Sequence, residues 1–434
     1  MKKQTINIGL IGCGVVGTGV ANNLLNIESA RRNLPCEIRL KKIADLYPFK
    51  ERPYKIPFDL FTTNADELLD DPEIDIIVEL IGGCGFALKV IKDALMRKKS
   101  VVTANKALLA EYGPYLASLA KQNEVDLYYE AAVCGGIPVI KAVREGLACD
   151  SIANFRGIVN GTCNYVLTRM GKDGMAFDDA VKAAQQNGYA EADPTFDLMG
   201  KDSLHKLVLL MANCFGQWIK PESVYTEGIM GLDQTDIRCA GELGYDIKLL
   251  AWARAKDGKL ECMVAPTLIN KNSMLSGVTD AYNAVEINGS PIGRTLYYGE
   301  GAGMNATSSA VTADIIDIAR NIYSGSVGRV PVFALKPDEL ELVPAPEMEM
   351  RYYLRWKTDD RPGVISALSQ VLTEREIGIS SVILHEFAKA QPYSIVTFMT
   401  RETTEARMKD SIAALNKLNC IQSKTVMLRV ESGF

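Results

Sequence analysis

The sequence predicts an α/β protein with a doubly wound parallel sheet, a second α+β unit and a small ferredoxin-like unit at its C-terminal end. Over the first 133 residues, short apolar runs alternate with helical patterns, which is typical of a parallel sheet. A glycine-rich loop separates the first strand from the first helix. Residues 350–434 follow the order βαββαβ.

Length and composition indicate a multi-domain globular protein. The chain has 434 residues, of which 47% are hydrophobic and 23% are charged. We divide it into a dinucleotide-binding domain (1–133, completed by 301–325), a substrate-binding and catalytic domain (134–300), a proline-rich linker (326–349) and the C-terminal unit (350–434). Residues 299–304 are the second glycine loop, and the helix expected at 308–320 returns the chain to the first domain.

Charge, hydropathy and cysteine usage exclude several classes of function. The net charge of −5 gives no electrostatic reason to expect nucleic acid or an anionic membrane as a partner. No apolar run is long enough to span a bilayer, and the N-terminus lacks a signal-peptide pattern. The ten cysteines form no CxxC pair, so we expect reduced thiols and a cytoplasmic location.

The first strand, loop and helix predict a dinucleotide site. Residues 5–11 are expected to form a buried strand, and the GxGxxG sequence that follows precedes a helical segment. In this order the glycines allow a tight turn and close approach to a pyrophosphate, which lies at the helix N-terminus. The cofactor-binding residues expected here are Gly12, Gly14, Val15, Val16 and Gly17.

The end of the second strand, residues 37–45, bears on which cofactor is used. Asp45 is suited to bind a ribose 2′-hydroxyl, which favours NAD. Lys50 and Arg52 follow it and could pair with a 2′-phosphate, which favours NADP. The sequence leaves NAD and NADP both open, and a solvent-exposed loop is the alternative for the two basic residues.

The later strands of this domain place two more candidates. We expect strands at 75–80, 100–103 and 126–133 and helices at 87–97 and 107–122. Lys106 follows a strand at the edge where ligands bind, so it is a candidate for the substrate and nicotinamide side. Glu130, with the glycine-rich backbone after it, could bind a monovalent cation through oxygen atoms, or it could be a hydrogen-bonded structural residue.

The most informative stretch is 187–210, NGYAEADPTFDLMGKDSLHKLVLL. From residue 202 the apolar residues recur at helical spacing, so Asp202 and Lys206 share one helix face. Glu191 and Asp197 arrive from the preceding loop. Carboxylates around one ammonium can bind an amino-acid zwitterion and supply a proton. The alternative is an exposed, salt-bridged helix start.

The rest of the chain gives weaker signals. We expect a helix at 240–253 and a strand at 260–268, and Gly303 lies in the second glycine loop. Cys163, in an Asn-Gly-Thr-Cys-Asn turn, could be a nucleophile if His205 reached it, or a buried inert thiol. The elements expected in the C-terminal unit are strands at 352–357, 379–386, 393–400 and 422–430, helices at 364–374 and 404–418, and the loop 358–363.

Taken together, these segments resemble homoserine dehydrogenase of the long bacterial type along essentially the whole chain. The resemblance rests on GLIGCGVVGTGV, VVTANKALLA, YYEAAVCGGIPVI, IVNGTCNYVLT, GYAEADPTFDLMGKDSLHKL and GEGAGMNATSSAV. The segment DDRPGVISALSQVL resembles the start of an ACT domain, a small amino-acid-sensing module.

The resemblance implies a reversible reduction of L-aspartate 4-semialdehyde to L-homoserine with NAD or NADP as the cofactor, in threonine, methionine and isoleucine biosynthesis. It implies that Lys206 donates the proton, with Asp202 as its partner, and that Glu191 and Lys106 lie at the substrate. It also implies a sodium site at Glu130, Val133, Gly135 and Ile137, a Rossmann-type first domain, and a homodimer or homotetramer formed through the second domain.

For the C-terminal unit, the resemblance implies regulation by threonine as the effector. The ligand-facing residues expected there are Asp360, Arg361, Pro362 and Gly363, because helix N-terminal N–H groups suit a carboxylate. Two alternatives remain. One is an acylating semialdehyde dehydrogenase that uses Cys163, although this family usually has threonine at that position. The other is an amino-acid sensor without enzyme activity.

Overall fold

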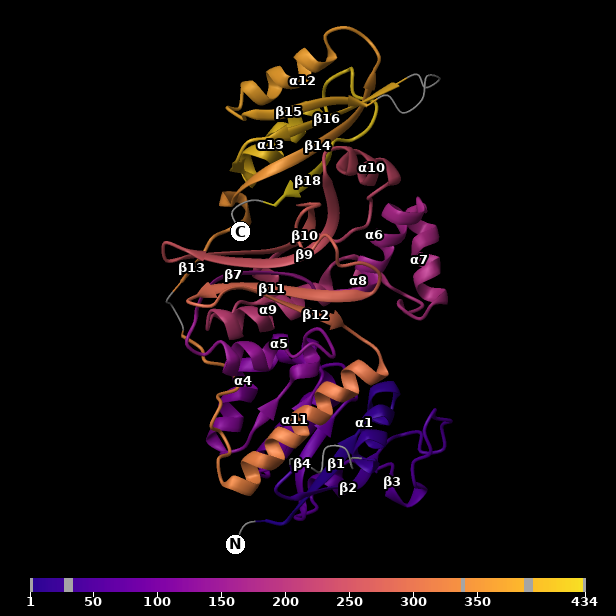
Figure 1. Cartoon of the computed structure of the whole chain (residues 1–434), viewed down its shortest axis with the longest axis vertical. Coiled ribbons are helices and arrows are strands. Elements are labelled where there is room, and N and C mark those ends of the chain that lie inside the picture. The colour runs from indigo at the N-terminus through magenta and orange to yellow at the C-terminus, as the bar shows by residue number, and fades with distance from the viewer. Residues whose placement is uncertain (1–2, 27–33, 337–339, 386–392, 432–434) are drawn as a thin grey trace. The chain divides into compact units, whose positions relative to one another are not determined.

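The computed structural model describes residues 3–26, 34–336, 340–385 and 393–431, which divide into two compact units (Figure 1). Unit 1 contains residues 1–152, 204–223 and 282–339, and unit 2 contains 153–203, 224–281 and 340–434. Residues 337–339 of the expected linker and residue 386 of an expected strand lie outside the described residues. Within the described part of the chain, none of the helices has the length and apolar character needed to cross a membrane.

Unit 1 is built on a six-stranded sheet in which all pairings are parallel. Its order, β3-β2-β1-β4-β5-β6, is the order found in dinucleotide-binding folds and confirms the predicted doubly wound sheet. From β1 the strand order runs outward to one edge through β2 and β3, and to the other edge through β4, β5 and β6. Ligands bind at such a switch point, so the loops after β1 and β4 form the expected ligand site. The strands are β1 (Thr5–Ile11), β2 (Glu37–Ala44), β3 (Phe61–Thr62), β4 (Ile74–Glu79), β5 (Ser100–Thr103) and β6 (Leu127–Tyr128).

The last strand of this sheet is shorter than the sequence predicted. The expected strand 126–133 has only two residues in β6, and the chain then enters a 3-10 helix, η4 (Glu130–Ala132). Glu130 therefore starts a helical turn and is not part of a strand. The other helical elements before residue 147 are α1 (Val15–Leu25), η3 (Phe58–Leu60), α2 (Asp66–Leu69), α3 (Gly85–Met96), α4 (Lys106–Gln122), α5 (Val139–Lys141) and the π-helical turn η5 (Ala142–Gly146).

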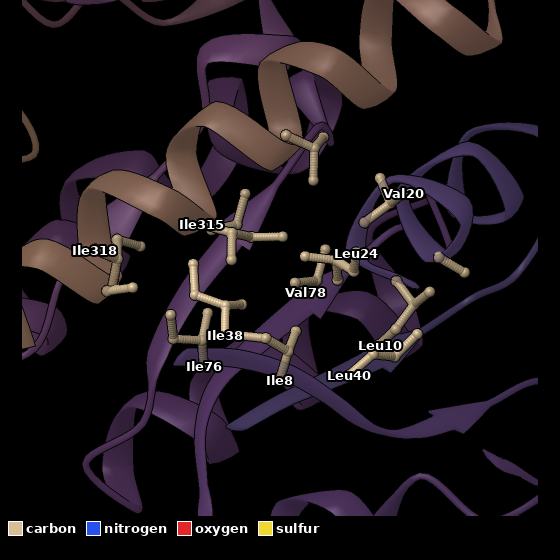
Figure 2. Packing of buried hydrophobic residues seen from close by; sticks show 14 of the residues in the cluster. Ile8, Leu10, Val20, Leu24, Ile38, Leu40, Ile76, Val78, Ile315 and Ile318 are labelled. Carbon is tan, nitrogen blue, oxygen red and sulfur yellow. The ribbon is translucent and has the colours of Figure 1, made fainter. Parts of the chain in front are cut away.

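A distant segment completes the core of unit 1. Helix α11 (Met304–Ser324) lies beside α1 on one face of the sheet (Figure 1). Its Ile315 and Ile318 belong to the same buried cluster as side chains of α1, β1, β2 and β4, and Figure 2 shows Ile315 near Leu24 and Val78. Both isoleucines are fully buried, so the helix removes a large apolar area from water. Residues 282–339 of this unit also hold the hairpin of β11 (Tyr282–Ser290) and β12 (Gly293–Glu300).

Unit 2 is organised around the antiparallel pair β9 (Tyr245–Lys256) and β10 (Lys259–Asn270). The helix expected at 240–253 is wrong: α10 (Gln234–Glu242) ends early, and Gly244 takes a positive φ of 83° before β9 begins. Alanine, leucine and lysine in this segment favour a helix, but twelve-residue pairing with β10 and burial of residues 247–253 on both faces decide for a strand.

The remaining elements of unit 2 surround this pair. Strand β7 (Ser151–Ile158) pairs with β9, and β8 (Tyr225–Thr226) and β13 (Glu341–Leu342) pair with β10. The helices of this part are α6 (Gly161–Asp173), α7 (Phe177–Gln186) and α8 (Thr195–Leu198). Helix α9 (Lys201–Cys214) contains a boundary between the units, because residues up to 203 belong to unit 2 and residues 204–223 belong to unit 1. The short helix η6 (Pro221–Ser223) follows α9.

The C-terminal part of unit 2 contains the elements βαββαβ in the expected order. Its strands lie in the order β18-β14-β16-β15, and each neighbouring pair is antiparallel. Strand β18 also pairs with β10, so this part continues the sheet of unit 2. The elements are η7 (Ala345–Glu347), β14 (Glu349–Asp359), α12 (Val364–Thr373), β15 (Ile379–His385), β16 (Tyr393–Thr400), β17 (Thr403–Thr404), α13 (Glu405–Leu415) and β18 (Val426–Val430).

Candidate active site

The glycine loop after β1 has the shape that a dinucleotide requires. The amide of Gly12 donates to the carbonyl oxygen of Ala44 at 2.9 Å, which ties the loop to β2. A Cβ at Gly17 would overlap the carbonyl oxygen of Gly12, so only glycine permits this turn. Among the described residues other than Gly14 and its two chain neighbours, none has a heavy atom within 4 Å of the place a Cβ at Gly14 would take. This open space at the start of α1 fits a pyrophosphate, which the Val15 and Val16 end of the helix would face.

The end of β2 brings Asp45 to this loop. The Asp45 carboxylate accepts hydrogen bonds from the backbone N–H of Cys13 at 2.6 Å and of Tyr47 at 2.7 Å. Arg52 lies beside it, with 3.6 Å between Nη2 and Oδ1. The structure therefore brings these two predicted residues together at the glycine loop.

A buried carboxylate organises the ends of β4 and β5. Glu79 is fully buried and accepts from Thr103 Oγ1 at 2.6 Å and from the amides of Ile81 and Gly82. Asn105 caps α4 by accepting from the Leu108 amide, and the half-buried Lys106 starts the helix directly after it. Sequence reasoning identified Lys106 but missed Glu79, whose role depends on contacts with a neighbouring strand.

Helix α9 carries the two residues on which the sequence argument depended. The side chain of Lys206 is buried, with 7% of the residue exposed, and Asp202, one turn earlier, is 5% exposed. Burial of both residues contradicts the alternative of an exposed, salt-bridged helix start. Lysine and aspartate are rarely buried to this extent unless they have partners, so the two residues stand out on this helix face.

A residue absent from the predicted site joins two of its carboxylates. Asn160 Nδ2 donates to Asp197 Oδ1 at 2.8 Å and to Asp202 Oδ2 at 2.9 Å. Its Oδ1 accepts from the Cys163 amide at 2.8 Å and so caps α6. Thr162 Oγ1 lies 3.1 Å from Asp197 Oδ2. The asparagine-rich turn after β7 was the sequence signal that could have indicated this cluster.

Glu191 and Cys163 have different surroundings from this cluster. Glu191 lies in the exposed loop before α8, where its carbonyl oxygen accepts from Gln185 Nε2 at 3.2 Å. Cys163 is fully buried, and its Sγ lies 3.2 Å from the carbonyl oxygen of Asp197. In this contact the thiol donates to the carbonyl oxygen, a hydrogen bond that only the neutral thiol form can make. His205 is half-buried on α9.

The Glu130 carboxylate is engaged with backbone. Its two oxygens accept from the amides of Ile140 at 2.8 Å and Lys141 at 2.7 Å, and its own amide donates to Asp314 at 2.8 Å. Burial raises the pKa of Glu130 to about 7, and burial next to Glu130 raises the pKa of Asp314 to about 8. Cys134 and Gly135 have positive φ values of 56° and 50°, so the backbone after Glu130 is sharply turned.

The expected effector loop lies between β14 and α12. Asp360 accepts from Ser394 Oγ at 3.1 Å, and Arg361 Nε lies 3.4 Å from Asp359 Oδ2. Gly363, with a φ of 91°, ends the loop where α12 begins. Gly303 plays the same part at α11, with a φ of 102°.

The two units divide the candidate residues between them. Gly12–Gly17, Asp45, Lys106, Glu130, Lys206 and Gly303 belong to unit 1, whereas Glu191, Asp197, Asp202 and the loop 359–363 belong to unit 2. Among them, the structure brings together Asp45 with the glycine loop, and Asp197 with Asp202 through Asn160.

Two family models match the chain. Residues 12–130 match the model described as homoserine dehydrogenase, NAD binding domain, and residues 138–316 match the model described as homoserine dehydrogenase. Together these matches take in more than half of the sequence. The boundary between them falls after Glu130, where the sheet of unit 1 ends.

Relatives of known name and structure agree with the family models. The homoserine dehydrogenases of Neisseria gonorrhoeae and Pseudomonas aeruginosa are 42% and 40% identical to this chain, and each alignment covers 99% of both proteins. The crystal structure of a homoserine dehydrogenase from Thiobacillus denitrificans is similar over the whole of both chains, with a TM-score of 0.90 and 40% identity. By these matches, this chain belongs to the homoserine dehydrogenase family of NAD(P)-dependent oxidoreductases.

Proposed function

We propose that this protein catalyses the reversible reduction of L-aspartate 4-semialdehyde to L-homoserine, with Lys206 as the proton donor. The observation that carries the proposal is the buried lysine one helical turn after a buried aspartate in α9. Burial excludes bulk water, so the protein itself has to move the proton at this place. Lysine carries a transferable proton in its charged form, whereas the neighbouring carboxylate does not.

The chemistry divides between the cofactor and the side chains. When bound, the nicotinamide supplies or accepts the hydride. Lys206 gives a proton to the aldehyde oxygen in reduction and takes it back in oxidation. Asp202 holds the Lys206 ammonium and the substrate in place. Lys106, at the start of α4, lies beside the substrate and the nicotinamide.

The acidic residues of unit 2 bind the amino-acid part of the substrate. Asn160 donates to one oxygen of each of Asp197 and Asp202, and Thr162 Oγ1 donates to the second oxygen of Asp197, so this network fixes the positions of both carboxylates near the substrate. Glu191 lies on the exposed loop before α8, where it can meet an entering ligand. We assign Glu191 to the substrate ammonium, because an ammonium group offers three donors that carboxylates satisfy.

Kinetics of two variants test these roles. Lys206→Ala should lower kcat by roughly 10²–10⁴-fold, because a positioned general acid contributes about that much, with cofactor binding intact. Glu191→Gln should mainly raise the KM for homoserine. The measurement is the absorbance of reduced nicotinamide with homoserine and NAD or NADP as substrates. Full turnover in Lys206→Ala would refute the assignment, and an unchanged KM in Glu191→Gln would remove that residue from the substrate site.

We further propose that residues 350–434 form an ACT domain through which threonine inhibits the enzyme. The order βαββαβ supports this proposal, as does the loop 359–363, which ends at the N-terminus of α12. Less than three quarters of this chain suffices to cover 98% of an archaeal homoserine dehydrogenase whose structure contains NADPH, with a TM-score of 0.61 and 26% identity. A dehydrogenase of this fold therefore exists without a counterpart of the remaining quarter.

The cation site and the assembly complete the proposal. We propose that Glu130, Val133, Gly135 and Ile137 hold a sodium ion, with the last three contributing backbone carbonyl oxygens. The Glu130 carboxylate accepts one backbone N–H on each oxygen, which fixes this turn. The positive φ values at 134 and 135 support the proposed site, because they turn successive carbonyls. We propose a homodimer or homotetramer in the cytoplasm, with domains at 1–133 plus 301–325, 134–300 and 350–434 and a linker at 326–349.

A further inference from the structure

We propose that the cofactor site of this protein selects NAD(H) over NADP(H), and that Asp45 is the residue that makes the selection. The sequence left this choice open, because an acidic residue and two basic residues follow the second strand. The inference rests on the proposed dehydrogenase function, since it specifies which of two cofactors that reaction uses. All of the residues that carry it belong to unit 1.

The backbone holds the Asp45 carboxylate beside the glycine loop. Its Oδ2 accepts from the amide of Cys13, the residue between the first two glycines, at 2.6 Å. Its Oδ1 accepts from the Tyr47 amide at 2.7 Å. In a dinucleotide-binding sheet, this is the place of the adenosine ribose, where a carboxylate accepts from the 2′-hydroxyl. A 2′-phosphate would instead bring two like charges together, which is repulsive.

The guanidinium of Arg52, 3.6 Å from the Asp45 carboxylate, already donates hydrogen bonds to backbone carbonyl oxygens. Its Nε donates to the Cys13 carbonyl oxygen at 3.1 Å, its Nη1 donates to the carbonyls of Pro48 and Lys50, and its Nη2 donates to Tyr47. Four of its five N–H donors are therefore engaged. The side chain is 7% exposed and lies over the Phe61 ring, 4.8 Å from the centroid. Binding a phosphate through Arg52 would require the protein to break this network.

The surroundings of Asp45 suit the base of the cofactor better than a phosphate. Leu46, Tyr47, Pro48, Phe49 and Lys50 line an open pocket of about 460 Å³. Phe49 stacks on Phe58 with ring centroids 4.8 Å apart, and both rings are more than half exposed. Apolar walls of this kind suit a planar base. Lys50 is exposed at the rim of this pocket. Water and salt screen its charge, so it would attract a 2′-phosphate only weakly.

The test measures cofactor binding directly and uses a charge-matched control. Dissociation constants of the full-length protein for NAD⁺ and NADP⁺ are measured by titration calorimetry, without substrate. We expect NAD⁺ to bind at least about tenfold more tightly than NADP⁺. Asp45→Asn keeps an oxygen for the Cys13 amide but removes the charge, so the preference should fall at least about tenfold, mainly through tighter binding of NADP⁺. Asp59→Asn removes the same charge from an exposed position of the same segment and should leave the preference unchanged.

Each outcome decides between the alternatives. Equal or tighter binding of NADP⁺ by the wild-type protein overturns the proposal, and Lys50→Gln then shows whether that lysine holds the phosphate. An NAD⁺ preference that survives Asp45→Asn removes Asp45 as the selecting residue. An effect of equal size in Asp59→Asn shows a general effect of charge. Failure to oxidise homoserine with either cofactor would contradict the proposed function and leave the binding ratio valid, so the two failures are distinguishable.

Discussion

Asn160 shows how one neutral side chain can arrange two negative charges. Its amide nitrogen donates to both Asp197 and Asp202, and its oxygen caps α6 through the Cys163 amide. The shared hydrogen-bond donor offsets part of the electrostatic repulsion between the two carboxylates and so holds them close together. Asn160 is therefore a positioning residue, which fixes the direction from which the carboxylates meet a ligand.

Replacing Asn160 should separate its two roles. Asn160→Ala removes both the cap, at a cost of about 1 kcal/mol in stability, and the bridge between the carboxylates. Asn160→Ser keeps a cap but offers only one hydroxyl donor. We expect kcat/KM for homoserine to fall on the order of 10²-fold in both variants, because displaced carboxylates misplace the substrate. Thermal denaturation should show a loss of stability mainly in the alanine variant. Normal kcat/KM in both variants would contradict the positioning role.

Residues whose role depends on local spacing were predictable, and residues joined across the fold were not. Asp202 and Lys206 are four positions apart, so helical periodicity alone places them on one face. Asn160 reaches carboxylates 37 and 42 positions further along the chain, and no periodicity reports such pairs. Glu79 was missed for the same reason, because its partner Thr103 lies on the neighbouring strand.

At the scale of elements, the parallel sheet of unit 1 was predictable because its strands are short, apolar and separated by helices. The segment 245–256 was not, because its residues favour a helix and only the pairing with β10 makes it a strand. The end of β6 was also misjudged. Glu130 leaves the sheet there because its carboxylate accepts hydrogen bonds from the backbone N–H groups of Ile140 and Lys141. No local sequence pattern predicts this contact.

The junction of η4 with α11 predicts a dependence of stability on pH. Burial beside Glu130 raises the pKa of Asp314 to about 8, above the value of about 3.9 expected in the unfolded chain. The folded state therefore binds more protons, and stability falls as pH rises from about 4 to about 8. In Asp314→Asn this contribution is absent, so its melting temperature relative to wild type should rise across that range.

Melting curves of both proteins at several pH values between 5 and 9 check this expectation. Asp59→Asn serves as the control, because it removes an exposed carboxylate of unit 1. Its difference from the wild-type protein should not follow the same trend. Parallel curves for the wild-type protein and Asp314→Asn would show that the Asp314 carboxyl does not titrate in this range.

At the scale of the molecule, two buried arginines of the C-terminal elements form ion pairs with earlier residues of unit 2. Arg355 of β14 bonds Asp236 of α10 at 2.6 Å, and neither side chain is exposed to more than 3%. Arg429 of β18 bonds both Glu227 and Glu405. Deleting residues 349–434 would take Arg355 away from Asp236 and β18 away from β10, so the deletion would also alter the rest of unit 2. Point variants are therefore the better test of regulation.

Threonine regulation should depend on the loop before α12. Asp360→Ala removes the hydrogen bond with Ser394 and alters the loop that is expected to meet the effector. We expect threonine inhibition to weaken while turnover without threonine stays near the wild-type value. Glu374→Ala, at the far end of α12, is the control and should keep the inhibition. Inhibition that is unchanged in Asp360→Ala would contradict the assignment of this loop, and a wild-type enzyme insensitive to threonine would contradict the effector.

The helix that closes the first core is made late in synthesis. Val20, Leu24 and the strand residues beneath them need Val311, Ile315 and Ile318, which follow almost three hundred positions further along the chain. When the residues of the parallel sheet have left the ribosome, one apolar face of that sheet is therefore still exposed to water. Until α11 has been synthesised this apolar face is exposed, so a pause in translation between the sheet and α11 would favour aggregation.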